Sequence, residues 1–467
     1  MLKGLEIVEK KLSYAQNNKD YRLDSGFYTS EIKQNENLTY RKIGDCLKKS
    51  QYGISINMNN EGQGYPIYRM NEIHNMFCDF EVDKFANISR LEAEIFKLND
   101  GDVLFNRTNS YEWVGRTGIF RKTKKQDFVF ASYLVRFIPD EKIILPEYLV
   151  TYLNSKYGIK DIRRRARQSI NQTNVNPEEV KEMFIPLLSE GLQNIIKKSF
   201  DEAFDKNVSS QNLYIKAEDL LLEELGLRDF QPSEQGINIK SLKDSFLSTG
   251  RLDAEYYQPK YDDYLELIQN YSQGSKPLKK VCNLRDENFE PLSDEVYNYI
   301  ELSNIGKSGD ITGATEDIGS QLPSRARRIV NTDDVIISSI EGSLSSCALV
   351  TEDYDNALCS TGFYVINSRE INSETLLVLF KSEPMQNILK QGCSGTILTA
   401  INKLEFQNIP VPLIEKETQN AIQSLIQQSF TLKAKSEQLL ETAKTLVEMA
   451  IEQGEEKALT NFELGLA

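Results

Sequence analysis

The chain has 467 residues, enough for roughly two to four domains. Lys and Arg total 55 against 69 Asp and Glu, which gives a formal net charge of −14, and 40% of the residues are hydrophobic. This composition is typical of a folded acidic protein, has no apolar run long enough to span a membrane, and disfavours non-specific coating of nucleic acid because the long-range field repels phosphate.

Histidine and cysteine usage excludes several kinds of site. The six cysteines never form a Cys-x-x-Cys pair, which argues against a zinc site or a disulfide framework. The single histidine excludes a metal site built from two histidines. The N-terminus lacks the apolar stretch of a signal peptide. We therefore expect a cytoplasmic protein that binds no metal and does not enter a membrane.

The first half of the chain contains a series of short motifs that ends in a long helix. It opens with Arg22-Leu23-Asp24, and the expected elements then follow in this order: a strand at 65–73, a Gly-Asp turn with a strand and polar loop at 100–110, a serine-bearing strand at 130–138, a helix at 146–155, and a polar loop with a proline-containing strand at 166–188. Short strands rich in β-branched and aromatic residues mixed with helices predict an α/β domain with a twisted mixed sheet.

A long amphipathic helix is expected next, over 190–225. Leu192, Ile196 and Phe200 share one face, and Gly226 provides a helix stop. Such a helix spans about 54 Å at about 1.5 Å per residue, the length of about 16 base-pair steps of duplex DNA.

The second half repeats the same features in the same order. The copies are Arg251-Leu252-Asp253, a strand at 297–305, a turn and strand at 332–343, a strand at 358–366, a helix at 373–382, a polar segment at 392–414 and a long helix at 415–453 before Gly454. We predict two tandem domains of one fold and two helices that pair as an antiparallel coiled coil with pseudo-two-fold symmetry. The helix pattern alone fits a purely structural coiled coil as well.

The expected boundaries follow from this repeat. They are a first domain at 1–189, a central helix at 190–229, a second domain at 230–414, a distal helix at 415–455 and a C-terminal tail at 456–467.

Signatures of catalysis are missing from the sequence. There is no Asn-Pro-Pro-Tyr motif of adenine methylation and no glycine-rich cofactor loop after a strand. The Gly-Lys-Ser at 306–308 lacks the preceding glycine of a phosphate-binding loop, because position 301 is Glu301. We therefore predict that the chain is not an enzyme and binds no cofactor itself.

Basic clusters and polar loops indicate nucleic-acid binding more strongly than any motif indicates catalysis. Clustered arginines suit phosphates and the guanine edge, and amide and hydroxyl side chains suit base edges. The basic clusters lie at 160–168, 325–328 and 121–125, and each is also consistent with a solvated surface paired with acids. The matching polar loops of the two halves differ in their side chains. Two domains that bind different DNA sequences would differ in this way, although random divergence of ordinary surface loops would look similar.

The candidate DNA-binding residues are drawn from these segments. In the first half they are Tyr68, Arg69, Arg107, Thr108, Asn109, Ser110, Trp113, Arg163, Arg164, Arg165, Arg167, Gln168, Ser169, Asn171, Gln172 and Asn174. In the second half they are Asn304, Lys307, Arg325, Arg327, Arg328, Ser338, Ser339, Glu341, Ser343, Ser394, Thr396, Thr399 and Asn402.

The duplicated order of motifs resembles the DNA-specificity (S) subunits of type I restriction-modification systems. The residues that carry the resemblance are the two Arg-Leu-Asp openings, the Gly-Asp-Val-Leu strand at 101–104 with its looser copy at 334–336, and the segments at 169–186 and 395–412. Two such units, each followed by a long helix, cover nearly the whole chain.

The resemblance implies a non-catalytic subunit that recognises a bipartite, asymmetric site in double-stranded DNA. Each repeat would be a target-recognition domain for one half of the site, and the helices would act as a ruler for the spacer. They would also dock two methyltransferase subunits, which carry S-adenosylmethionine and adenine-N6 chemistry, and a restriction-translocase subunit would join for cleavage in defence against foreign DNA.

Three alternatives remain at the level of sequence. One is the recognition subunit of a bipartite-site type II system with a fused methyltransferase-nuclease. Another is an enzyme with an unrecognised site, and the last is a coiled-coil adaptor that does not bind DNA. The target bases and the spacer length do not follow from the residues.

Overall fold

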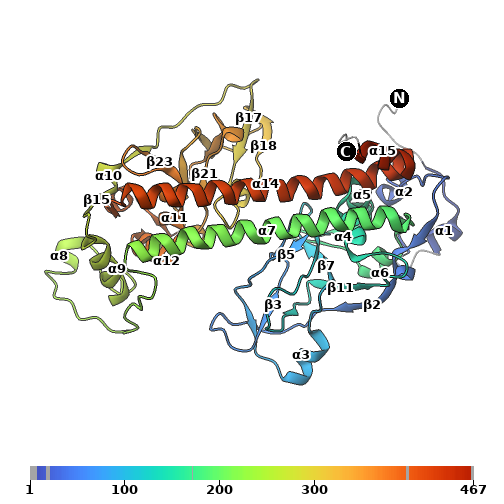
Figure 1. Ribbon diagram of the computed structural model, residues 1–467, viewed down its shortest axis with the longest axis horizontal. Helices are drawn as coiled ribbons and strands as arrows, with labels where there is room; N and C mark the ends of the chain where they lie inside the picture. Colours follow the sequence, from blue (N-terminus) through green and yellow to red (C-terminus); the bar gives the residue numbers. More distant parts are fainter. Residues whose placement is uncertain (1–7, 17–20, 171, 396–398, 464–467) are drawn as a thin grey trace. The chain divides into compact units, whose positions relative to one another are not determined.

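The computed structural model describes residues 8–16, 21–170, 172–395 and 399–463. The chain divides into two compact units, and each combines one repeat with segments of both long helices. Unit 1 contains Met1–Asn207 and Ala434–Ala467, and unit 2 contains Val208–Lys433. The predicted long helices are α7 (Glu190–Glu224) and α14 (Lys416–Gln453) (Figure 1).

Unit 1 is built on a six-stranded sheet whose strand order is β2-β11-β7-β9-β5-β4. Its strands are β2 (Leu47–Tyr52), β4 (Ile73–His74), β5 (Phe77–Cys78), β7 (Val103–Asn106), β9 (Thr117–Ile119) and β11 (Leu134–Pro139). Smaller sheets contain β1 (Tyr40–Lys42) with β14 (Phe184–Pro186), β3 (Tyr65–Tyr68) with β6 (Phe85–Ala86) and β10 (Val129–Phe130), and β8 (Thr108–Asn109) with β12 (Arg167–Gln168) and β13 (Thr173–Asn174). The remaining helices are α1 (Leu12–Gln16), α2 (Ser25–Thr29), α3 (Arg90–Phe96), α4 (Pro146–Asn154), α5 (Lys156–Arg165), α6 (Pro177–Lys181) and α15 (Glu455–Glu463).

Unit 2 has the same plan, with a four-stranded sheet of order β16-β23-β20-β21. Its strands are β16 (Cys282–Arg285), β20 (Val335–Ser338), β21 (Cys347–Leu349) and β23 (Phe363–Ser368). The smaller sheets contain β15 (Ser275–Pro277) with β26 (Pro410–Pro412), β17 (Val296–Ile300) with β18 (Thr315–Ile318), β19 (Ala326–Ile329) and β22 (Leu358–Ser360), and β24 (Cys393–Ser394) with β25 (Ala400–Ile401). The helices are α8 (Phe246–Thr249), α9 (Pro259–Gln269), α10 (Leu278–Val281), α11 (Ser373–Lys381), α12 (Glu383–Gln391) and α13 (Lys403–Asn408).

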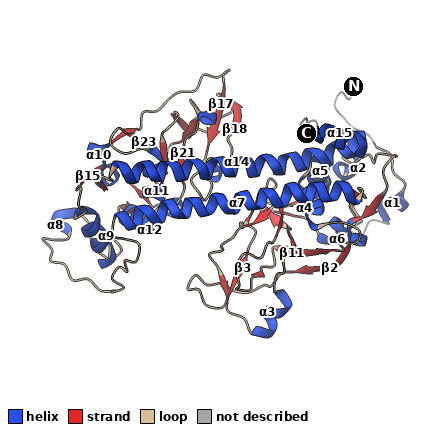
Figure 2. Ribbon diagram, in the orientation of Figure 1, coloured by secondary structure: helices blue, strands red, loops and turns tan. Residues whose placement is uncertain are grey.

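Strand pairing confirms the predicted fold class and repeat. The order β2-β11-β7-β9 in unit 1 corresponds to β16-β23-β20-β21 in unit 2. The parallel pair β3–β10 corresponds to the parallel pair β17–β22, and the antiparallel pair β1–β14 corresponds to β15–β26. Helices and strands are interspersed in both units (Figure 2). The chain is therefore a mixed α/β protein with two units of one topology, while the pseudo-two-fold relation stays a prediction.

The Arg-Leu-Asp motifs fasten the start of each repeat to the end of a helix. Arg22 Nε donates to Asp24 at 2.7 Å, and Arg22 Nη1 donates to the carbonyl of Arg165, the last residue of α5, at 2.8 Å. Tyr28 completes the arrangement by donating from its hydroxyl to the Arg22 carbonyl at 2.6 Å. The second motif makes the same bonds, from Arg251 to Asp253 and to the carbonyls of Gln391 and Cys393, and from Tyr257 to the carbonyl of Arg251.

In unit 1, the first part of α7 runs antiparallel to the last part of α14. Ser436 donates to the Ala203 carbonyl at 2.6 Å, and farther along the pair the backbone N–H of Ser189 donates to Glu455 at 2.9 Å. Apolar side chains of both helices share the core of this unit with α4 and the large sheet. Burial of these stripes against the domain, more than helix propensity, stabilises the long helices.

In unit 2, the second part of α7 pairs with the first part of α14 in the same antiparallel sense. Ser429 donates to the Ser210 carbonyl at 2.8 Å, and Thr418 donates to Glu224 at 3.0 Å. The two serines are almost fully buried, so these short polar side chains allow a close approach of the helices and favour one register. The antiparallel pairing predicted from the sequence is thus present in each unit.

The ends of the long helices agree closely with the glycine signals. Gly226 and Gly454 follow the helices with φ angles of +68° and +88°, a left-handed conformation that glycine adopts without strain. Beyond Gly454 the expected tail contains helix α15. All six cysteines are buried free thiols. Among the described residues, no helix is both long enough and apolar enough to cross a membrane.

Candidate nucleic-acid interface

A small three-stranded sheet in unit 1 gathers polar residues from distant parts of the sequence. Strand β13 pairs with β8 on one side and β12 on the other, so that Asn174 lies opposite both Thr108 and Arg167. Thr108 Oγ1 donates to Asn174 Oδ1 at 2.6 Å, although the two residues are 66 positions apart. We call this β8–β13–β12 sheet and its flanking loops the unit 1 edge.

Exposed aromatic side chains surround the unit 1 edge, and several stack on arginines. The Arg116 guanidinium lies 3.4 Å from the ring centre of Trp113, and that of Arg163 lies 5.7 Å from the ring centre of Tyr111. Both rings are at least 40% exposed, so their faces are accessible from solvent. Burial lowers the pKa of Arg116 to about 10, which leaves the guanidinium charged at neutral pH.

A second aromatic contact lies where β7 leads into β8. The Arg107 guanidinium lies 5.3 Å from the ring centre of Tyr52, and the Arg107 backbone N–H donates to the Tyr133 carbonyl at 3.0 Å. Arg107 Nε has no hydrogen-bond partner among the described residues. Tyr52, Tyr133 and Arg116 are not among the candidate DNA-binding residues drawn from the sequence. The only sequence signal for them is that aromatic and basic residues alternate in these segments.

The predicted residues of unit 1 that reach solvent concentrate at this edge. Gln168 ends β12, and between β12 and β13 the Ser169 backbone N–H and hydroxyl both donate to the Gln172 carbonyl; all three residues are exposed. The other partly or fully exposed members are Arg107, Asn109, Ser110, Trp113, Arg163, Arg167 and Asn174. Asn171, also predicted, lies outside the described residues.

Tyr68 and Arg69 make internal contacts instead. Tyr68 is 2% exposed, packs in the core and donates its hydroxyl to the Asp79 carbonyl. Arg69 forms an ion pair with the buried carboxylate of Glu72, which also accepts from the Arg69 backbone N–H. We therefore remove both residues from the expected DNA-contacting set.

Two arginines of the first basic cluster are also structural. Arg165 is 6% exposed and donates to Asp161 at 3.1 Å and to Glu179 at 2.8 Å. Arg164 donates to Asp161 at 2.9 Å and to the Phe27 carbonyl at 2.9 Å. Burial requires charges to be paired, and these acids supply the partners. Of the three consecutive arginines that end α5, only Arg163 presents an exposed side chain.

The third basic cluster is likewise paired with acids. Arg121 donates to Asp201 at 2.8 Å and forms an ion pair with the buried Glu147. Lys122 and Lys124 each contact a neighbouring acid. Arg121 thus links α4 to α7, and the pairing of Arg121, Lys122 and Lys124 with acids agrees with the alternative of a solvated, paired basic surface.

Unit 2 contains a counterpart of the unit 1 edge. It consists of β24, β25 and Ile340, which lies two residues after the end of β20. Ile340 pairs with Ala400, and the Glu341 backbone N–H donates to the Thr399 carbonyl at 3.0 Å. Ser339 and Arg325 lie nearby, because they contact the adjacent residues Gly362 and Thr361. Ser339, Glu341, Arg325, Ser394 and Thr399 are each at least partly exposed. Thr396 lies outside the described residues.

Other residues of unit 2 that were predicted to contact DNA make contacts within the unit instead. Ser338 is fully buried and bonds to Ser343 at 2.9 Å, so we remove it from the expected surface. Arg328 donates to the Phe363 carbonyl, and Arg327 pairs with Glu290 at 3.0 Å.

Three further candidates lie in loops or at a helix start. Asn402 caps α13 by accepting from the Glu405 backbone N–H at 3.0 Å. Asn304 accepts from the Glu301 backbone N–H at 2.9 Å, and Lys307 is exposed in the same β17–β18 loop.

Matching backbone bonds allow the two edges to be aligned position by position. The Val175 backbone N–H donates to the Arg107 carbonyl at 2.9 Å, and that of Ile401 donates to the Ser339 carbonyl at 2.8 Å. Equivalent positions of the edges therefore carry different side chains: Arg107 and Ser339, Thr108 and Ile340, Asn109 and Glu341, and Asn174 and Ala400. These four positions differ between the edges, whereas Thr173 and Thr399 are the same, and the Arg-Leu-Asp contacts of the scaffold are repeated. No group of acidic, cysteine or histidine side chains within the described residues could hold a metal ion.

Comparison with known proteins gives relatives of one kind. No family model matches the chain. It is 23% identical over 415 residues, 88% of this chain and 91% of the other, to a protein of Methanocaldococcus jannaschii named as the MjaX specificity subunit of a type I restriction enzyme. It is 28% identical over 142 residues, 30% of each chain, to the EcoKI specificity subunit of Escherichia coli.

Solved structures give matches of the same kind at low similarity. The type I S subunit from M. genitalium aligns over 90% of this chain and 97% of its own, with 14% identity and a TM-score of 0.37. The HsdS subunit from Thermoanaerobacter tengcongensis aligns over 91% and 98%, with 12% identity and a TM-score of 0.29. From the sequence matches, the resemblance drawn from the repeated motifs is confirmed: this chain is similar to one specificity subunit of a type I restriction enzyme over most of its length, and to a second over about a third of it.

Proposed function

We propose that the chain is a sequence-specific DNA-recognition subunit whose two units each read one half of a bipartite site. The observation that carries the proposal is the contrast between scaffold and edge. The Arg-Leu-Asp fastening and the strand order are repeated, whereas equivalent edge positions carry side chains of different hydrogen-bonding character. Two copies of one framework with different edges suit two different base sequences.

The edge residues have suitable chemistry for base and phosphate contacts. Asparagine and glutamine match the N6 and N7 of adenine, arginine matches the O6 and N7 of guanine, and glutamate accepts from the N4 of cytosine. In unit 1 these roles fall to Asn109, Gln168 and Arg107, and in unit 2 to Glu341. Arg163 and Arg167, at the end of α5 and in β12, are the phosphate contacts that position unit 1.

The acidic character of the chain is compatible with this function. A net charge of −14 weakens non-specific attraction to DNA, so binding depends on the few exposed cations of the edge. A recognition subunit benefits from this arrangement, because a lower affinity for non-specific DNA raises the specificity ratio.

The partners are the remaining part of the proposal. The chain directs two methyltransferase subunits, which supply S-adenosylmethionine and adenine-N6 methylation, and a restriction-translocase subunit to the site. The long helices set the spacer between the half-sites and offer docking surfaces. The similarity of this chain to a specificity subunit over nearly the full length of both proteins supports this part.

Long-read methylome sequencing tests the proposed function directly. A host that expresses the full chain with its partner methyltransferase should acquire N6-methyladenine at a bipartite motif, and a host that expresses the methyltransferase alone should not. Unchanged methylation, together with the absence of sequence-selective duplex binding by the purified complex, would favour the DNA-independent adaptor. A partner that is one fused methyltransferase-nuclease would identify the type II alternative.

A further inference from the structure

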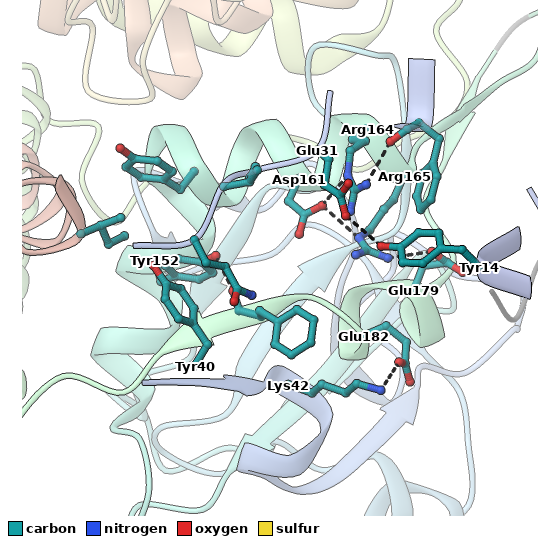
Figure 3. Close-up of a pocket in the computed structure, with 16 residues that line it drawn as sticks. Tyr14, Glu31, Tyr40, Lys42, Tyr152, Asp161, Arg164, Arg165, Glu179 and Glu182 are labelled. Atoms are coloured by element: carbon teal, nitrogen blue, oxygen red, sulfur yellow. Dashed lines mark hydrogen bonds and ion pairs between the residues drawn. The ribbon is translucent and has the colours of Figure 1, made fainter. Parts of the chain in front are cut away.

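Unit 1 contains a cavity of about 500 Å³ that DNA recognition does not use. Helices α5 and α6, strands β1 and β14, the N-terminal segment and the end of α14 surround it (Figure 3). Its aromatic lining consists of Tyr14, Phe27, Tyr40, Tyr152, Tyr157 and Phe184. The volume lies within the roughly 300–1,000 Å³ of typical binding pockets.

The same surface of the scaffold is covered in unit 2 by its own helix α9. Helix α9 packs against α12 and β26. The equivalents of α12 and β26 in unit 1 are α5 and β14, as shown by the Arg-Leu-Asp bonds to the two helix ends and by the β1–β14 and β15–β26 pairings. In unit 1, α5 and β14 line the cavity instead.

The difference arises from the length of one connection. From the tyrosine that follows the Arg-Leu-Asp motif to the first strand, unit 1 has 12 positions (Tyr28 to Tyr40) and unit 2 has 18 (Tyr257 to Ser275). The longer connection forms α9, whereas residues 30–39, all of which the structure describes, form no helix. Unit 1 therefore retains this framework without an equivalent of α9, and the short helix α1 contributes only Tyr14 to the cavity.

Helix α9 shows which side chains this framework accepts. Its buried residues are Tyr261, Tyr264 and Ile268, whose spacing of three and four places them on one helix face. Phe184, on the equivalent of β26, is 44% exposed at the cavity, and Tyr14 is 46% exposed. Large apolar side chains left in solvent on a concave surface are typical of a docking site.

A buried ion pair lies in the wall of the cavity. Glu179 has a side chain only 1% exposed, and its Oε2 accepts from Arg165 at 2.8 Å (Figure 3). Its Oε1 is buried and has no hydrogen-bond partner among the described residues. Because Oε1 is itself buried, it is out of reach of a molecule in the cavity, and the Glu179–Arg165 pair forms part of the cavity wall.

We propose that this cavity receives an amphipathic helix from a partner subunit. The helix presents aromatic or aliphatic side chains at positions i, i+3 and i+7, as α9 does in unit 2. The inference rests on the proposed function only in that it requires a partner subunit, taken to be the methyltransferase. It assigns a docking site to unit 1 that is separate from the long helices.

Site-specific photo-crosslinking tests this assignment in the assembled complex. The photoreactive amino acid p-benzoylphenylalanine replaces Phe184 in one variant and, as a matched control, Leu91, which is 81% exposed on α3 of the same unit. After irradiation, mass spectrometry should find Phe184 linked to a segment of the methyltransferase with the i, i+3, i+7 pattern, and Leu91 not linked to that segment. Crosslinks only to residues 1–7 of the same chain, or none in an assembled complex, would overturn the proposal.

An affinity measurement complements the crosslinking. Phe184→Asp should weaken binding of the purified methyltransferase by at least about tenfold, as expected for a central interface aromatic, whereas Leu91→Asp should not. Equal affinities of the two variants would contradict the docking site. If the wild-type complex assembles and methylates a specific motif but these tests fail, only the docking inference is lost; if no specific methylation occurs, the proposed function itself fails.

Discussion

Gln193 and Gln419 make the same hydrogen bonds in the two repeats. Gln193 Nε2 donates to the Leu188 carbonyl at 2.9 Å, and its Oε1 accepts from the backbone N–H of Leu145, the residue before α4, at 2.9 Å. Gln419 Nε2 donates to the Ile414 carbonyl at 2.8 Å, and its Oε1 accepts from the N–H of Asn372, the residue before α11, at 2.9 Å. Each buried amide thus attaches a domain to the first turn of its own long helix.

Removing either amide should destabilise the unit that contains it. Gln193→Leu and Gln419→Leu each leave buried backbone groups unsatisfied, at a cost of about 1–3 kcal/mol in free energy of unfolding. Denaturant unfolding of the full chain measures this loss, with Gln428→Leu on the exposed face of α14 as the control. A loss no larger than that of the control would show that the amides do not hold the domains.

Acid should weaken the attachment of α4 to α7 in unit 1. Burial acts to raise the pKa of Glu147, but hydrogen bonds from Lys197 and Arg121 outweigh it and hold the pKa below its usual value. A carboxyl with a lowered pKa in the folded state stabilises the fold above its unfolded pKa of about 4.3, and this contribution is lost as the pH falls through the folded pKa.

Glu147→Gln should therefore cost about 1–3 kcal/mol at neutral pH and leave unfolding less dependent on pH in the acid range. Urea unfolding at several pH values measures both effects, with the exposed Glu61→Gln as the control. A variant whose pH dependence equals that of the wild type would contradict the assignment.

The exposed arginines of the unit 1 edge should determine the salt dependence of DNA binding. Arg163→Ala and Arg167→Ala should each weaken binding and reduce the slope of log K against log salt by about one, because each removes about one phosphate contact. Trp113, the only tryptophan of the chain, provides a fluorescence readout at the edge itself. Lys457→Ala, an exposed lysine of α15, is the control. Slopes equal to that of the control would remove these residues from the interface.

Lengthening both long helices should change the spacer of the recognised site. One heptad inserted after Asn207 and one after Lys433, where the two units meet in sequence, adds about 10 Å, or about three base-pair steps. Methylome sequencing should then show the same half-sites separated by a longer spacer. An unchanged spacer in a folded, active complex would refute the ruler hypothesis.

Much of the architecture was predictable because it repeats. Glycines 226 and 454 correctly marked the helix ends, and the Arg-Leu-Asp motifs correctly marked the start of each copy. The expected strand at 130–138 was less accurate, since the structure divides it between β10 and β11 in different sheets. An apolar run does not reveal where a chain leaves one sheet for another.

The candidate interface was only partly predictable, since charge in a sequence does not reveal partners. Arg163 and Arg165 look equivalent in the sequence, yet Arg165 turns toward Asp161 and Glu179 in the interior. Tyr52, an exposed residue at the end of β2, becomes part of the edge only through its contact with Arg107. Such long-range contacts have no local sequence signal.

The central claim is that each unit reads its own half of the site, and half-site methylome analysis tests it most directly. Hosts expressing the complex with Asn109→Ala in unit 1, or with Glu341→Ala in unit 2, are compared with the wild type by long-read sequencing. If each unit contacts its own half-site, each substitution should relax base preference in one half of the motif only, and in opposite halves. Relaxation of the same half by both, or of both halves by either one, would contradict it.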